Sequence, residues 1–323
     1  MANSNSSELV DVHAHFLTEE YVSAAVSAGI VQPDGMPMWP SWSIEAQLEL
    51  MQHNRIRHAV LSMSTPGVSF ADPSDASALA RHVNDFAVTT VAAHPGRFSF
   101  FASLPLPDVD AAVVEAQRAI DRHAAAGVVL LSNHRGQYLG DAALDPLWVY
   151  LNARQSIVFV HPTSPPHAET VALGRPPAHD RVHVRNHPHR NRFDLRERGR
   201  PVPRHQVLDP ALRGGRPSAS GGAYRAVPQP VADARRRATR TPDDRNPVAP
   251  LMVRPRRVSD AHPGVSRVGC VGTERILYGS DFCWTPAFGV AKQVAALDAD
   301  RSIDWRRVTS ENAQRVLGDI LAV

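Results

Sequence analysis

The sequence has few cysteines and no long hydrophobic run. Only Cys270 and Cys283 occur among the 323 residues, which argues against a disulfide framework and favours a reduced, cytoplasmic setting. No apolar stretch is long enough to span a membrane, and Met1 to Glu8 lacks the hydrophobic region of a secretory signal. We therefore expect a cytoplasmic protein that does not engage membranes. Hydrophobic residues make up 43% of the chain, which is enough for an ordinary core.

Acidic residues are scarce in one segment, although the formal net charge of the whole chain is only +3. Residues 175–268 contain 21 of the 35 lysines and arginines, 8 of the 32 acidic residues and 14 of the 27 prolines. Such a break in composition is typical of a separate domain, a basic tail or a disordered insert. An arginine-rich insert that binds nucleic acid is the interpretation we rank last, because the segment contains no recognised nucleic-acid-binding module. We expect no nucleic-acid partner.

Outside that segment, apolar runs alternate with helical patterns. A long loop rich in proline, methionine and tryptophan is expected after the first strand, and the third helix should end at Gly127, a helix-terminating residue. Repeated β-α units predict a parallel sheet or a (β/α)8 barrel, and the strands missing from a complete barrel should lie in residues 170–268. The predicted strands are Leu9–His15, His58–Ser62, Phe98–Leu104, Val128–Leu131, Ile157–His161 and Arg275–Gly279, and the predicted helices are Ser43–Asn54, Asp75–His94, Asp108–Ala126, Asp145–Arg154, Pro286–Leu297 and Thr309–Leu317.

The first predicted strand carries two histidines, His13 and His15, two residues apart. Side chains alternate along a strand, so both rings point to the same face. Two imidazoles on one face can hold one divalent metal ion, which then needs further ligands. Two other apolar runs end in candidate ligands, His161 and Asp281. The sequence therefore predicts a metal site at the C-terminal rim of a parallel β structure.

Several residues near these ligands are candidates for a supporting role. Asp11 lies two residues before His13 and is a candidate partner of the ligands. Asn133 and His134 follow a predicted strand, so they either line the pocket or belong to an ordinary loop. Trp284 is a candidate for the wall of the cavity.

Five short motifs stand in the first half and near the end of the chain: V-D-V-H-A-H-F at 10–16, G-Q-Y-L-G-D at 136–141, V-F-V-H-P-T at 158–163, L-Y-G-S-D-F at 277–282 and S-E-N-A-Q-R-V-L at 310–317. Together they resemble the motifs of the amidohydrolase superfamily. The branch is the one that contains aminocarboxymuconate-semialdehyde decarboxylase, and the second and third motifs look most similar to 6-methylsalicylate decarboxylase and its relatives. The resemblance covers roughly residues 8–174 and 271–320.

This resemblance implies one α/β domain over residues 1–323, a (β/α)8 TIM-like metal-dependent hydrolase barrel that is incomplete or distorted in its middle third. It implies that His13, His15, His161 and Asp281 bind one divalent metal, zinc first and manganese second, and that Asp281 also handles a proton. The implied activity is non-oxidative decarboxylation of a small aromatic or unsaturated carboxylic acid, such as 6-methylsalicylate. Hydrolysis of an amide or lactone is the alternative, since the same metal activates water. A homodimer is also expected.

The family carries a catalytic histidine in a P-H-x-x-G-G-like motif that this sequence lacks. His205 is the nearest candidate, but its neighbours do not match the motif. We interpret residues 175–270 as translated out of frame, because the codons of residues 204–217, read one base later, permit a P-H…G-G motif. Such a chain would keep its metal ligands, would lose the general acid or base and the strands that close the barrel, and would be a poorly ordered, inactive relative.

Overall fold

Parallel strands form a closed barrel in the order β1-β10-β9-β8-β7-β4-β3-β2. The computed structural model describes residues 8–164, 166, 206–209, 251–254 and 273–322. The fold confirms the predicted (β/α)8 TIM-like barrel. The strands are β1 (Leu9–His15), β2 (Ile56–Ser62), β3 (Phe98–Ser103), β4 (Gly127–Leu131), β7 (Ile157–His161), β8 (Gln206–Asp209), β9 (Leu251–Arg254) and β10 (Ile276–Tyr278).

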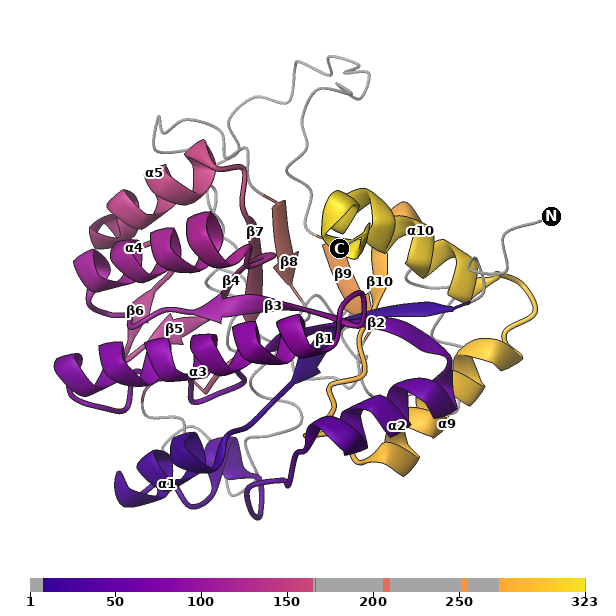
Figure 1. The fold of residues 1–323 in the computed structure, drawn as a ribbon, viewed down its shortest axis with the longest axis horizontal. Coiled ribbons are helices and arrows are strands. Elements are labelled where there is room, and N and C mark those ends of the chain that lie inside the picture. The colour runs from indigo at the N-terminus through magenta and orange to yellow at the C-terminus, as the bar shows by residue number, and fades with distance from the viewer. Residues whose placement is uncertain (1–7, 165, 167–205, 210–250, 255–272, 323) are drawn as a thin grey trace, which may run out of the picture.

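The helices lie outside the ring of strands, as Figure 1 shows. Ser43 and Asp108 accept hydrogen bonds from backbone N–H groups of the helices that follow them, which fixes where α2 and α4 begin. A short antiparallel pair, β5 (Asn133–His134) and β6 (Gln137–Tyr138), follows β4. The helices are α1 (Glu19–Ser27), α2 (Ile44–Asn54), α3 (Pro73–Ala93), α4 (Val109–Gln117), α5 (Asp145–Ala153), α9 (Ala287–Ala299) and α10 (Trp305–Leu317), and the shorter turns are Pro33–Gly35, Arg118–Arg122, Ala142–Leu144, Thr273–Arg275 and Gly318–Ala322.

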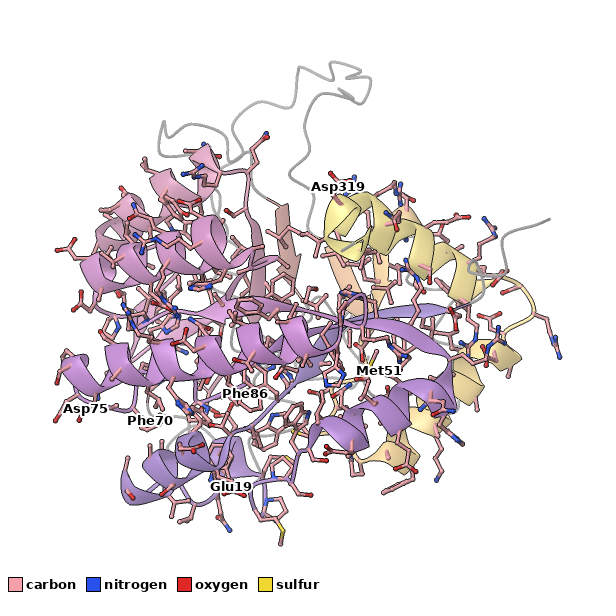
Figure 2. All side chains as sticks on the ribbon, in the orientation of Figure 1. Glu19, Met51, Phe70, Asp75, Phe86 and Asp319 are labelled. Carbon is pink, nitrogen blue, oxygen red and sulfur yellow. The ribbon has the colours of Figure 1, made fainter. Side chains whose placement is uncertain are left out.

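Two apolar cores hold the barrel together. The inner core fills the barrel itself, where the rings of Phe101 and Phe159 stack with centroids 5.5 Å apart. The outer core lies between the strands and the helices; there Phe86 of α3, labelled in Figure 2, stacks on Phe16 at 5.7 Å. Burial on both faces explains why the strands read as continuous apolar runs rather than as alternating ones.

Two local predictions were wrong. The expected loop after β1 contains helix α1, which Thr18 caps by accepting a hydrogen bond from the N–H of Tyr21 at 3.1 Å. The helix expected over Asp108–Ala126 ends at Gln117 and passes through a π-helical turn, and Gly127 is the first residue of β4. A Cβ at Gly127 would lie 2.1 Å from the carbonyl oxygen of Ile157, so glycine is required there by close strand approach.

The strands that complete the barrel lie in the segment of unusual composition. β8 pairs with β7, β9 pairs with β10, and the two pair with each other. The order of paired strands is therefore closed. The rest of residues 175–270, His205 included, lies outside the described residues, so the frameshift interpretation stays a prediction. In the described part of the chain, none of the helices has the length and apolar character needed to cross a bilayer.

Candidate metal centre

The structure brings together the four side chains that the sequence singles out. One ligand atom from each of His13, His15, His161 and Asp281 lies within 4.8 Å of the other three. The two imidazole Nε2 atoms of β1 are 2.8 Å apart, and the Asp281 Oδ1 atom is 3.7 Å from that of His13 and 3.4 Å from that of His15. All four stand at or just beyond the carboxyl ends of β1, β7 and β10, the end of such barrels where active sites lie.

Backbone hydrogen bonds fix the aspartate against β1. The N–H of Asp281 donates to the carbonyl oxygen of His13 at 2.8 Å, and the N–H of His15 donates to that of Phe282 at 2.5 Å. Asp281 has a left-handed backbone, φ 60°, a conformation that aspartate tolerates better than most residues. Its Oδ2 atom accepts from the hydroxyl of Thr285 at 3.3 Å, which leaves Oδ1 turned toward the histidines.

Asp11 joins the two ligand-bearing segments. Its Oδ1 atom accepts hydrogen bonds from the backbone N–H of His13 at 3.1 Å and of Ser280 at 3.0 Å. Asp11 is fully buried, and this burial raises the pKa of its carboxyl group. The sequence suggested a partner of the ligands; the structure places its hydrogen bonds on the backbone beside them rather than on an imidazole ring.

Carbonyl oxygens set the protonation of two imidazoles. The Nδ1 atom of His15 lies 3.1 Å from the carbonyl oxygen of Ser62, and that of His161 lies 2.8 Å from that of Pro162. A carbonyl only accepts, so each Nδ1 carries the proton and each Nε2 presents its lone pair to the site. Burial lowers the pKa of His161 well below its usual value, and the neighbouring histidines lower it further. Three nitrogens and one carboxylate oxygen are thus a donor set that fits a divalent transition metal.

A cavity of about 330 Å³ lies beside this centre. Leu131, one of its lining residues, pairs with His161 across β4 and β7. Asn133, a predicted pocket residue, lines the cavity together with Arg135 and Thr163, which sequence reasoning missed. Thr163 belongs to the motif V-F-V-H-P-T, from which only the histidine was taken as a site residue. No local sequence pattern indicates Arg135.

Trp284 and His134 are both buried. The ring of Trp284 lies 5.8 Å from that of Trp39, next to the loop that follows Asp281. His134 follows β4 in the hairpin, and burial lowers its pKa to about 4, so the ring is neutral at pH 7. Neither residue is part of the group of four ligand atoms.

Curated relatives of this chain are decarboxylases. Over 161 residues it is 40% identical to the decarboxylase yanB of Aspergillus niger, covering 48% of this chain and 43% of that protein. It is 38% identical over 161 residues to the 6-methylsalicylic acid decarboxylase acuB of Aspergillus aculeatus, covering 48% of each. The chain thus spans about half the length of the curated relatives it matches.

Solved structures share the fold. A dihydroxybenzoic acid decarboxylase from Polaromonas sp. JS666, with bound manganese and the inhibitor 2-nitroresorcinol, superimposes with a TM-score of 0.70 at 19% identity, covering 97% of this chain and 98% of that one. At this level of sequence identity, the similarity is evidence for a shared barrel fold only. The family model described as Amidohydrolase matches residues 10–318, which is nearly the whole chain. The chain belongs to the amidohydrolase family.

Proposed function

We propose that this protein is a metal-dependent decarboxylase that releases carbon dioxide, without an oxidant, from a small aromatic carboxylic acid such as 6-methylsalicylate. The observation that carries the proposal is the convergence of three imidazoles and one carboxylate at the C-terminal mouth of an amidohydrolase barrel. The similarity to decarboxylases in two fungi supports this reaction over the others known to suit such a site.

We infer that His13, His15, His161 and Asp281 hold one divalent ion. Imidazole suits zinc, which the sequence favours, and the mixed nitrogen and oxygen donors also suit manganese, the ion bound by the solved Polaromonas enzyme. When bound, the ion acts as a Lewis acid and a template for the substrate's oxygen atoms. The homodimer implied by the resemblance stays a prediction.

The chain's own groups supply the rest of the chemistry. Asp281 is the candidate proton carrier: its carboxyl group delivers a proton to the ring carbon that bears the carboxylate. Aromaticity is lost at that step and returns when the carbon–carbon bond to the carboxylate breaks and carbon dioxide leaves. The Thr285 hydroxyl, 3.3 Å from Oδ2 of Asp281, holds the carboxyl group in place. Phe159, a fully buried residue whose ring lies 5.0 Å from that of His13, gives the site an apolar neighbour.

The proposal is tested by direct assay of the purified protein loaded with zinc or with manganese. We expect 6-methylsalicylate to yield carbon dioxide and the corresponding phenol in equal amounts, with activity lost after chelation and restored by adding the ion back. Asp281→Asn keeps the shape of the side chain but removes the carboxyl group that we infer to bind the ion and to carry the proton, so this variant should be inactive.

Two results would contradict the proposal in different ways. Turnover of lactones or amides with no carbon dioxide from any 2-hydroxybenzoate would assign the site to hydrolysis. Full metal occupancy without turnover of either substrate class would make the chain an inactive relative, as the frameshift interpretation implies.

A further inference from the structure

A buried hydroxyl group lies next to the metal centre without being one of its ligands. Ser64 belongs to the loop that follows β2, is 4% exposed, and its Oγ atom is 3.5 Å from Nε2 of His161. Nδ1 of His161 donates to the carbonyl oxygen of Pro162, so Nε2 accepts and the hydroxyl of Ser64 is the donor. The chemistry proposed for the metal centre gives this hydroxyl no role.

The loop that carries Ser64 is held in place by two hydrogen bonds. The carbonyl oxygen of Ser64 accepts from the N–H of Gly67 at 2.9 Å, which closes a tight turn. The next residue, Thr65, shares a hydrogen bond with Thr163, and the two hydroxyl oxygens are 2.7 Å apart. Because Thr163 lies two residues after His161, this contact also fixes the loop against the end of β7 that carries the ligand.

Ser64 lies where the metal centre meets the cavity of about 330 Å³. Two lining residues of the cavity are near neighbours of this contact in the chain: Pro66 follows Ser64 by two residues, and Thr163 follows His161 by two. A substrate that binds the ion and extends into this cavity would therefore lie next to the Ser64 hydroxyl.

Metal binding changes what this hydroxyl can do. A hydroxyl has one proton to donate, and in the described part of the chain the contact with His161 is the only hydrogen bond of the Ser64 side chain. When His161 binds an ion, its Nε2 lone pair is taken and the proton of Ser64 loses its acceptor. A buried donor without a partner costs free energy. The hydroxyl is then available to an oxygen atom that a ligand brings to the ion.

We propose that Ser64 is a substrate-binding residue, whose hydroxyl donates a hydrogen bond to an ion-bound oxygen of the substrate once the ion has displaced it from His161. The inference rests on the proposed function, because it assumes a substrate that brings carboxylate and ring oxygens to the ion. Such oxygens are ionised acceptors, and hydrogen bonds to ionised acceptors are stronger than neutral ones. Ser64 therefore adds affinity for the acidic ligand without adding affinity for the ion itself.

The test compares Ser64→Ala with the wild-type protein in two titrations that do not depend on turnover. The first adds manganese to the metal-free proteins. Because the hydroxyl leaves His161 when the ion binds, the two dissociation constants should agree within about twofold. The second adds 2-nitroresorcinol, the inhibitor bound by the Polaromonas enzyme, to the manganese-loaded proteins and follows the absorbance of the nitrophenol. Here Ser64→Ala should bind about tenfold more weakly, because it lacks one hydrogen bond to a charged oxygen.

The manganese titration separates this role from a structural one. Ser27→Ala, exposed at the end of α1, is the matched control and should behave as the wild-type protein in both titrations. A greater than about twofold loss of manganese affinity in Ser64→Ala would show that the serine supports the metal ligands, since such partners contribute about 10–100-fold, and would overturn the proposal. An unchanged affinity of Ser64→Ala for 2-nitroresorcinol would also overturn it, as would failure of the loaded wild-type protein to bind this ligand.

Decarboxylation of 6-methylsalicylate by the wild-type protein is measured separately. Both expected titrations without decarboxylation would refute the proposed function alone. Decarboxylation together with an unchanged affinity of Ser64→Ala for 2-nitroresorcinol would refute only the role of Ser64.

Discussion

At the scale of single residues, two of the three histidines of the metal centre are oriented before any ion binds. The carbonyl oxygens of Ser62 and Pro162 accept hydrogen bonds from the Nδ1 atoms of His15 and His161, so these two rings need no new tautomer to become ligands. A fully buried side chain such as His15 also loses little freedom on binding. Such preorganisation predicts tight binding that depends on each imidazole.

Replacement of His15 by alanine should lower the affinity for manganese or zinc by more than about 100-fold, because loss of even an outer partner of a ligand costs 10–100-fold. Metal content after dialysis against a graded chelator measures this. His53→Ala, on the exposed end of α2, is the matched control and should keep the wild-type content. Retention of a full equivalent by the His15 variant would remove this residue from the ligand set.

The sequence identified those site residues whose role can be inferred from the strand or short motif that contains them. His13 and His15 share a strand whose bounds were predicted to the residue, and His161 ends another such strand. Arg135 and Thr163, which line the cavity, were missed because they lie in different segments and neither belongs to a recognisable ligand pattern. The spacing of residues within one segment cannot predict a contact between distant segments that forms only when the barrel folds.

At the scale of elements, a polar network joins α3, α4 and β3. Glu115 of α4 is buried and accepts two hydrogen bonds from the guanidinium of Arg118, at 2.7 and 2.9 Å, and one from the amide of Asn84 at 2.7 Å. Asn84 in turn exchanges two hydrogen bonds with the backbone of Ser103 at the end of β3. The pKa of Arg118 is raised by its hydrogen bonds with Glu115 and, after a smaller opposing effect of burial, with Asp85.

Glu115→Ala should reduce the free energy of unfolding by about 3 kcal/mol, since removal of one partner leaves a poorly solvated charge and an unpaired amide. Urea unfolding measures the change. The control is Asp85→Ala: its carboxylate contacts the same guanidinium at 2.6 Å but is 54% exposed, so the loss should be about 1 kcal/mol or less. Equal losses in both variants would mean that burial of Glu115 contributes nothing.

The ends of helices and strands could be predicted where a local sequence pattern sets them. They could not be predicted where tertiary packing sets them. The apolar periodicity of Asp108–Ala126 continues past Gln117, yet the chain leaves the α-helix there to bring Gly127 against β7. The close contact between β4 and β7 depends on how the two strands pack, and in the sequence only Gly127 indicates it. The capping threonine of α1 and the two glutamates after it were a readable local signal.

At the scale of the whole molecule, the two ends of the described chain close the barrel. β1 pairs with β10, and Ser310 of α10 donates a hydrogen bond to the carbonyl oxygen of Glu8 at 2.5 Å. The sequence predicted the repeated units and located the missing strands in the correct region, but it did not give the bounds of β8 and β9. Arginine and proline dominate that region, so no clear β-α unit could be read there; in the structure β8 pairs with β7 and β9 pairs with β10.

Two buried histidines outside the metal centre, His58 and His134, make the stability of the whole fold sensitive to acid. Burial lowers the pKa of His58 and of His134 from 6.5 to about 4. Nearby arginines add to the effect at His58, and its hydrogen bond to the Gly96 carbonyl opposes it. Between pH 6.5 and 4 the unfolded chain binds protons that the folded chain does not, so stability falls as the pH drops through this window.

From pH 7.5 to 5 each of these histidines should cost roughly 2 kcal/mol of unfolding free energy. Urea unfolding of the metal-free protein at the two pH values measures the loss, to which His161 also contributes because its pKa is lowered as well. His58→Gln should be less stable at pH 7.5, because it gives up the 2.9 Å contact with the Ser99 hydroxyl, but its loss on acidification should be smaller by about 2 kcal/mol. His53→Gln, which removes an exposed histidine and leaves both buried rings in place, should keep the full pH dependence. An unchanged free energy of unfolding of the wild-type protein between pH 7.5 and 5 would mean that the two imidazole rings are accessible to solvent in the folded state.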